Sequence, residues 1–235
     1  MGAAPGLTVF AVTGIPEVGR GDPVGELVAD RAVLEDGDVV VVTQKIVSKS
    51  EGRVVACDPG DPTAKRRLAE SEGVRVLRRR GELLVTETRH GFVCASSGVD
   101  LSNVDEGFAV LLPVDPDRSA RRIRDQIRAR SGVMVGVVVS DTFGRAWRRG
   151  LTDVAIGCAG IAAVVDLRGT PDAHGRELAV TEVCVADEIA GAAELVMGKS
   201  AGLPVAVVRG VDPAWLRDSS VREEVVRPYG EDLFR

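Results

Sequence analysis

Two aspartates in this sequence lie at places where strands are expected to end. Asp141 follows Val135–Val139 after a single serine and is followed by Thr142, whereas Asp100 lies in the stretch SSGVDLSN. Carboxylate and hydroxyl oxygens are hard ligands that suit Mg²⁺ or Mn²⁺, and Mg²⁺ needs only one or two carboxylates beside water and phosphate. This pattern predicts a divalent-metal site formed by Asp100, Asp141 and Thr142. The alternative is that each aspartate only forms a turn after its strand.

Three arginines follow Asp141 within one polar segment that also contains Trp147. They are Arg145, Arg148 and Arg149. Arginine binds phosphate and carboxylate groups in a forked geometry, so Arg145 and Arg148 are candidates to hold an anionic substrate or a transferring phosphoryl group. The alternative is a solvated basic patch, or arginines paired with surface carboxylates.

Two segments after the first two expected strands can present backbone N–H groups to a nucleotide. Gly14–Val18 and Thr43–Lys49 are both interpreted as loops, and the second carries lysine for phosphate groups. A lysine after a strand is more often simply solvated. A further segment, Gly198–Ser200, looks like the end of a P-loop, but Ala193 stands where that pattern requires glycine, and a helix rather than a strand precedes it.

These candidate residues are expected to be positioned by mixed strands and helices without regular βαβ alternation. Short valine-rich runs predict strands at Leu7–Thr13, Asp38–Thr43, Leu83–Thr88, Ala109–Leu112, Val133–Val139, Ile161–Leu167 and Val205–Arg209. Apolar spacing predicts helices at Pro23–Leu34, Thr63–Arg79, Asp115–Arg130, Thr181–Met197 and Ala214–Val226. Polar stretches predict loops at Gly14–Asp22, Cys57–Thr63, Asp141–Gly150 and Gly169–Glu177.

Composition places the chain among globular proteins and argues against several other classes. The chain has 235 residues, 45% of them hydrophobic and only 3% aromatic, and a formal net charge of −5. An acidic protein with few aromatic side chains is a poor candidate for binding nucleic acid. No apolar run is long enough to span a membrane. The four cysteines form no CxxC pair, which indicates reduced thiols and a cytoplasmic protein.

Several segments, in consecutive order from about Leu7 to Gly210, resemble the coenzyme F420-0:gamma-glutamyl ligase family. Two of them, KIVSKSEGR and SDTFGRAWRRGLTDVAIG, are distinctive. The others are GIPEVGRGD, LLPVDPD, LAVTEVCVADEIAGAAELVMGK, PVAVVRG and the Thr-Glu pair within LLVTETRHGFVCASSGVDLSNV. Order and coverage make this resemblance more specific than any single motif.

The resemblance implies an enzyme that uses GTP and a divalent metal, Mg²⁺ or Mn²⁺, with K⁺ as an optional further cation. It would join L-glutamate to the terminal carboxylate of F420-0 through an acyl phosphate, and it could add further gamma-linked glutamates. By analogy, the nucleotide would contact Ile15, Pro16, Glu17, Val18, Gln44, Lys49 and Asn103. Asp100 and Asp141 would hold one metal, and Thr142 would contact a second. The implied fold is an α+β arrangement of two lobes in a single domain over residues 1–235, in an intertwined homodimer.

One position departs from the family pattern. Many relatives have Gln or Glu after the glycine of the MG segment, where this chain has Lys199, and a cation cannot ligate a metal. Either the second metal binds more weakly, or Lys199 itself reaches the nucleotide phosphates. In bifunctional relatives a flavin-binding domain follows this module, and none is expected within the present 235 residues. The alternatives are an amide-forming ligase acting on another acid, or a non-catalytic nucleotide-binding module of a larger flavoprotein.

Overall fold

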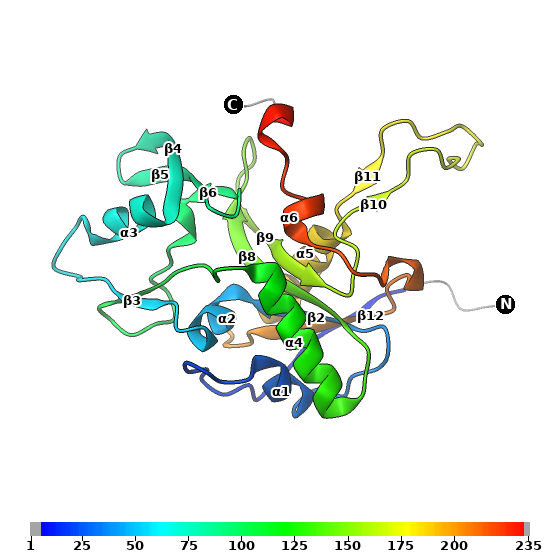
Figure 1. The fold of residues 1–235 in the computed structure, drawn as a ribbon, viewed down its shortest axis with the longest axis horizontal. Helices are drawn as coiled ribbons and strands as arrows, with labels where there is room; N and C mark the ends of the chain where they lie inside the picture. The colour runs from blue at the N-terminus through cyan, green and yellow to red at the C-terminus, as the bar shows by residue number, and fades with distance from the viewer. Residues whose placement is uncertain (1–5, 233–235) are drawn as a thin grey trace.

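The computed structural model describes residues 6–232 and contains a mixed five-stranded sheet together with three smaller sheets (Figure 1). The strands are β1 (Thr8–Ala11), β2 (Val39–Thr43), β3 (Val54–Ala56), β4 (Gly73–Arg80), β5 (Leu83–Thr88), β6 (Val93–Ala95), β7 (Phe108–Val110), β8 (Gly136–Gly144), β9 (Leu151–Ala159), β10 (Val165–Asp166), β11 (Glu182–Val183) and β12 (Val205–Arg209). The helices are α1 (Val24–Ala29), α2 (Gln44–Ser50), α3 (Ala64–Glu72), α4 (Pro116–Ser131), α5 (Val185–Met197) and α6 (Val221–Glu224). Short 3₁₀ turns lie at Ser96–Gly98, Pro213–Trp215 and Tyr229–Glu231. This α+β composition agrees with the fold class expected from the sequence.

The five-stranded sheet has the order β1-β12-β2-β8-β9. Strands β2 and β8 are parallel, and the other neighbours are antiparallel. Val39–Val42 of β2 and Val137–Val139 of β8 are fully buried. Continuous apolar strands of this kind require both faces of the sheet to be covered.

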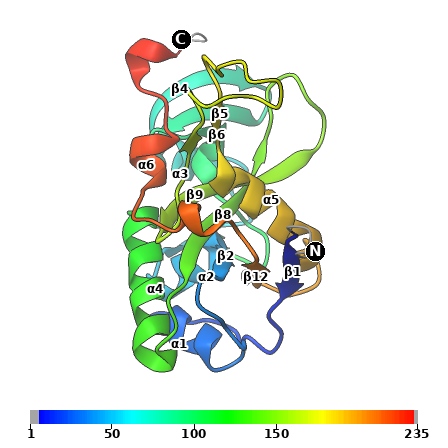
Figure 2. The same cartoon turned by 90° about the vertical axis from the view of Figure 1, so that its right-hand side faces the viewer.

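Helices cover the two faces of this sheet, as Figure 2 shows for α4 and α5. Helix α4 packs with α1 on one face through Ile123 and Ile127. Helix α5 packs on the other through Ile189 and Met197, among others. Helix α4 begins as the sequence predicts, because the Asp115 side chain accepts a hydrogen bond from the Arg118 amide at 2.9 Å and proline occupies the first turn.

The smaller sheets extend from this central layer. Strands β4, β5 and β6 form one antiparallel sheet, which packs against α3 around the buried Leu84 and Ala69. Strands β3 and β7 form a two-stranded pair, and β10 pairs with β11 at the base of a hairpin that projects from the body (Figure 1). The three-stranded sheet lies beside β8 of the central sheet, which β6 contacts (Figure 1).

Several predicted boundaries were wrong. The helix expected over Thr63–Arg79 ends at Glu72, and β4 follows, because the exposure of its side chains alternates with a period of two and it finds a partner in β5. The strand expected over Ile161–Leu167 is reduced to Val165–Asp166, and the helix expected over Ala214–Val226 is replaced by a 3₁₀ turn at Pro213–Trp215 and the short helix α6.

Two further corrections concern the candidate site. Thr43–Lys49 is not a loop, because α2 begins at Gln44 directly after β2. Asp141 does not follow its strand but lies inside it, because β8 continues to Gly144 by pairing with β9, a strand that the sequence analysis did not predict.

Two expectations from composition can be compared with the described residues. Within residues 6–232, no helix is both long and apolar enough to cross a membrane. The four cysteines are free thiols, three of them buried and Cys184 partly buried. The thiols therefore agree with the reduced state expected from their spacing.

Candidate active site

A cavity of about 520 Å³ lies at the edge of the central sheet where several connections meet. Because β2 and β8 are parallel, their carboxyl ends lie at the same edge, with Thr43 opposite Ser140. The segment after β1 and the segment before β12 reach this edge too, because β12 is antiparallel to both β1 and β2. Binding sites of sheets with parallel strands lie outside such carboxyl ends.

This topology brings together most of the residues that the sequence analysis selected. The cavity is lined by Ile15, Pro16, Glu17, Val18, Gln44, Lys49, Asp100, Asn103, Asp141, Thr142 and Lys199. Asp100, Asn103 and Asp141, which the sequence analysis assigned to a metal ion and a nucleotide, therefore line one cavity.

The arginine cluster lies elsewhere. Arg145 and Arg148 are exposed in the turn between β8 and β9, and neither lines the cavity. The Arg145 guanidinium donates a hydrogen bond to the Arg149 carbonyl at 3.1 Å, which holds the turn itself. Their placement in this structure matches the alternative of a solvated basic patch.

The pairing of β8 with β9 sorts the polar side chains onto two faces. Thr142 lies opposite Asp153, and a register shift between Val139 and Ser140 marks a bulge just before them. Asp153 is 3% exposed and accepts hydrogen bonds from the Ser140 hydroxyl at 3.0 Å and from the Thr142 hydroxyl at 2.6 Å. Because side chains alternate along a strand, Asp141 points to the opposite face.

The two aspartates predicted to hold metal differ in their environments. Burial, first of all, raises the pKa of Asp141 to about 7, and the nearby charges of Asp100 and Asp153 add to this effect. Burial opposes ionisation of Asp100 as well, but the Lys45 ammonium at 2.9 Å and the Ser102 amide outweigh it and lower its pKa. Asp100 is also tied by two backbone hydrogen bonds to Val110, so neither aspartate is a simple turn residue.

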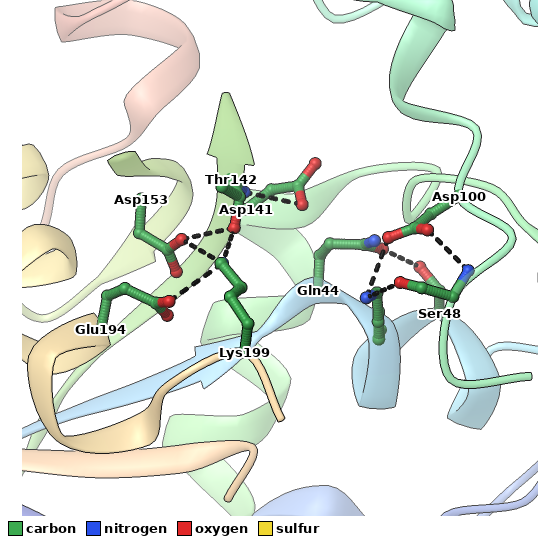
Figure 3. Close-up of polar contacts among 10 residues, drawn as sticks. Gln44, Ser48, Asp100, Asp141, Thr142, Asp153, Glu194 and Lys199 are labelled. Atoms are coloured by element: carbon green, nitrogen blue, oxygen red, sulfur yellow. Dashed lines mark hydrogen bonds and ion pairs between the residues drawn. The ribbon is translucent and has the colours of Figure 1, made fainter. Parts of the chain in front are cut away.

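Lys199 lies on the other face of β8, next to Asp153 (Figure 3). Its ammonium donates to the Thr142 hydroxyl and forms ion pairs with Asp153 at 3.0 Å and with Glu194 at 3.1 Å. Desolvation lowers the pKa of Lys199, but its bonds to these carboxylates outweigh that loss and raise the pKa above its ordinary value. Lys199 therefore remains a cation at neutral pH.

The backbone before Lys199 has a conformation that favours glycine. Gly198 has φ of +61° and ψ of 164°. Residues with a side chain rarely adopt this region, because it costs about 1–3 kcal/mol. Gly198 thus ends α5 and turns the chain so that the next residue meets the strands.

Helix α2 presents Gln44 and Lys49 to the cavity. Gln44 is 1% exposed, and its side-chain oxygen accepts a hydrogen bond from the Ser48 hydroxyl at 2.9 Å. Within the described part of the chain, its Nε2 has no hydrogen-bond partner. A buried donor without a partner is costly, so this amide is suited to an acceptor supplied by a ligand. Lys49 forms an ion pair with Glu17, which links the segments after β1 and β2.

Sequence reasoning missed three charged residues of this site. Asp153 and Glu194 line the cavity with Lys199, and Lys45 bonds to Asp100. Asp153 lies within one of the distinctive motifs, so recognition of a β8–β9 hairpin would have placed it opposite Thr142. Lys45 lies in the other distinctive motif, but its partner Asp100 lies far away along the chain. Glu194 lies only five residues before Lys199, and the contact between them depends on the turn at Gly198 that ends α5.

The acidic residues of the cavity fit a divalent metal. Among residues 6–232, no group of three or more His, Cys, Asp or Glu side chains is arranged to hold a metal ion. Mg²⁺ does not require such a group, because one or two carboxylates suffice when water and phosphate complete its shell. Burial is the main cause of the raised pKa of Asp141, and the nearby charges of Asp100 and Asp153 add to it, so a bound cation would stabilise the ionised carboxylate. Asp100 and Asp141 are therefore suitable ligands.

Comparison with known proteins finds a family model and relatives that match this chain. A family model described as F420-0:gamma-glutamyl ligase matches residues 14–210. A coenzyme F420:L-glutamate ligase of Methanopyrus kandleri is 40% identical to this chain, and the match covers 100% of both chains. Relatives with the same description from Methanothermobacter thermautotrophicus and Archaeoglobus fulgidus are 39% and 40% identical, over 98% and 97% of this chain and 99% and 96% of their own.

Proposed function

The chain belongs to the F420-0:gamma-glutamyl ligase family, and we propose that it catalyses the GTP-dependent addition of L-glutamate to the terminal carboxylate of F420-0. The products are the glutamylated cofactor, GDP and phosphate, and further gamma-linked glutamates can follow. The observation that carries this proposal is the meeting of Gln44, Lys49, Asp100, Asn103 and Asp141 in one cavity. Such a cavity offers groups for a nucleotide and for a divalent ion together.

The chemistry requires activation of a carboxylate, which is a poor acceptor for an amine. An oxygen of the F420-0 carboxylate attacks the γ-phosphorus of GTP, and the bond to the β-phosphate oxygen breaks to release GDP. The amine of glutamate then attacks the carbonyl carbon of the acyl phosphate, loses a proton and expels phosphate. Phosphoryl transfer of this kind depends on positioning and on neutralisation of phosphate charge.

The nucleotide would lie between the segments that follow β1 and β2. Ile15, Pro16 and Val18 offer an apolar wall beside Glu17, and Lys49 offers a cation for a phosphate group. The unpartnered Nε2 of Gln44 and the amide of Asn103 supply polar contacts for nucleotide or phosphate oxygens. These groups bind and orient the substrate and do not take part in bond making.

Asp100 and Asp141 would hold a divalent ion, Mg²⁺ or Mn²⁺, and Thr142 stands beside them as the residue assigned to a second ion by the family resemblance. A divalent ion there would neutralise phosphate oxygens, and K⁺ is a further candidate cation. Arg145 and Arg148 are proposed to reach the anionic acceptor from outside the cavity. That role requires the β8–β9 turn to move inward or another copy of the chain to present it.

We also propose that the enzyme is a two-lobed cytoplasmic protein that forms an intertwined homodimer. Large apolar side chains lie exposed at Trp147 and Leu151 on the β8–β9 hairpin, at Val180, and at Leu195 on α5. A second copy of the chain that covered these side chains would remove them from water. Light scattering of the purified protein should give twice the chain mass of 24.8 kDa if the dimer forms.

The activity can be tested by mass spectrometry. The protein is mixed with F420-0, L-glutamate, GTP and Mn²⁺, and the products are examined for an added glutamyl mass and for GDP. We expect product with the wild type, none in the presence of EDTA, and none with Asp141→Asn. Asp105→Asn removes a carboxylate from an exposed position and is the matched control.

The other outcomes distinguish the remaining candidates. Product formation from a different acid, but not from F420-0, would refute the proposed acceptor and keep the ligase chemistry. Metal-dependent GTP binding without any product would favour a nucleotide-binding module that serves a flavoprotein.

A further inference from the structure

The ammonium group of Lys199 lies among oxygens of the kind that bind divalent cations. Its partners are the Thr142 hydroxyl from β8, the Asp153 carboxylate from β9 and the Glu194 carboxylate from α5 (Figure 3). Hydroxyl and carboxylate oxygens are hard ligands. One lysine thus occupies the common centre of an oxygen cluster that carries two negative charges.

Burial makes a cation necessary at this point. The side chain of Asp153 is 2% exposed, that of Glu194 is 20% exposed, and that of Lys199 is 55% exposed. The carboxylate of Asp153 therefore lies beneath the ammonium, which covers it on the cavity side. A buried carboxylate without a counterion is strongly destabilising, so removal of the lysine charge leaves a demand for another cation.

The other hydrogen bonds of Asp153, and the position of Glu194 on α5, hold the lysine in place. Asp153 is oriented by Ser140 and Thr142, both in β8, and Glu194 is fixed on α5, which packs against the same sheet. Gly198 directs the chain from α5 toward this cluster. The ammonium thus stands at a set position on the wall of the cavity that contains Asp141 and Gln44.

We propose that Lys199 is a tethered cation that replaces a second divalent ion at the phosphate groups of the nucleotide. This chain then binds one divalent ion, at Asp100 and Asp141, and uses Lys199 at the cluster of Thr142, Asp153 and Glu194. Asp153 and Glu194 act as positioning residues for the ammonium. The proposal rests on the proposed function in one respect, because it takes the anionic ligand of the cavity to be nucleotide phosphate.

The test counts bound Mn²⁺ by equilibrium dialysis and electron paramagnetic resonance in the presence of GDP. We expect about one ion per chain for the wild type and about two for Lys199→Gln, because the vacated oxygen cluster then takes an ion. Lys65→Gln is the matched control, because Lys65 is exposed on α3 and lies outside the cavity, and it should keep the wild-type value. Lys199→Arg keeps the positive charge and should also bind one ion.

Two results would overturn the proposal. The first is two Mn²⁺ ions bound by the wild type, a measurement that needs no variant to fold. The second is a folded Lys199→Gln that binds no more ions than the wild type.

Asp141→Asn separates this inference from the proposed function. Combined with Lys199→Gln it should lower the count from two ions to one, and alone it should lower the count from one to none. If the wild type bound no Mn²⁺ and Lys199→Gln bound one, the ion at Asp100 and Asp141 would be refuted while the role of Lys199 would stand. Failure of the glutamylation assay would leave the ion counts unaffected.

Discussion

Replacement of Asp141 by asparagine should change how the stability of the metal-free protein depends on pH. Burial raises the pKa of this carboxyl from 3.8 to about 7. In the folded state the group keeps its proton between these two pH values, whereas in the unfolded state it loses it. The raised pKa therefore contributes stability that is fully present below pH 3.8 and is lost as the pH rises to about 7.

The size of this loss follows from the shift. A pKa difference of about three units corresponds to about 4 kcal/mol at most, and roughly 3 kcal/mol of it falls between pH 5 and pH 8. The free energy converted from the full shift is an upper limit, because the Asp141 side chain keeps some surface that is accessible to solvent. An asparagine side chain does not ionise. The free energy of unfolding of Asp141→Asn, relative to that of the wild type, should therefore rise by about 3 kcal/mol between pH 5 and pH 8.

Urea unfolding followed by circular dichroism in EDTA, at pH 5 and at pH 8, measures this difference. Effects of other titrating groups cancel when the variant is compared with the wild type at each pH. Asp105→Asn reports the effect of losing one exposed carboxylate. A difference between Asp141→Asn and the wild type that is the same at both pH values would refute the raised pKa of Asp141.

Three further changes have expected outcomes. Asp153→Asn should lower the free energy of unfolding by about 2–4 kcal/mol in urea, because the buried carboxylate accepts two hydroxyl hydrogen bonds and an ion pair; an unchanged midpoint would contradict this. Asp117→Ala should cost about 3–5 kcal/mol in the same assay, because its buried carboxylate accepts three backbone amides from β9 and α6; a loss under about 1 kcal/mol would argue against that link. Gly198→Ala should slow glutamylation at least about tenfold, because the strained backbone would displace Lys199. If the variant kept the kcat/KM of the wild type, the position of Lys199 would be unimportant for the reaction.

Local signals in the sequence predicted those parts of the fold that depend on neighbouring residues. Helix α4 begins where Asp115 and proline place it, and it ends at Gly132, which has φ of +77°. The valine-rich runs at β2, β8 and β12 became the buried strands of the central sheet. The order of the motifs along the chain was sufficient to indicate the family, which the comparisons confirm.

Errors arose where strand pairing overrides the local pattern. The apolar spacing of Thr63–Arg79 predicted a helix that included most residues of β4, yet pairing with β5 makes these residues a strand. Strand β9 contains glycine and polar residues and was not predicted, although it pairs with β8 over its whole length. That omission also placed Asp141 in a loop rather than in a strand.

The chemical groups of the site, the family of the chain and the elements set by nearby residues can all be inferred from the order of amino acids. Which of these groups meet depends on how the strands and helices pack. Lys199 contacts Asp153 across 46 residues and Thr142 across 57, and these meetings depend on the packing of α5 against the β8–β9 hairpin. Arg145 and Arg148 belong to the same motif as Asp141 but lie outside the cavity, because the hairpin carries its turn beyond the sheet edge. Proximity along the chain does not determine contact, since alternation and pairing of strands send neighbouring side chains to opposite faces.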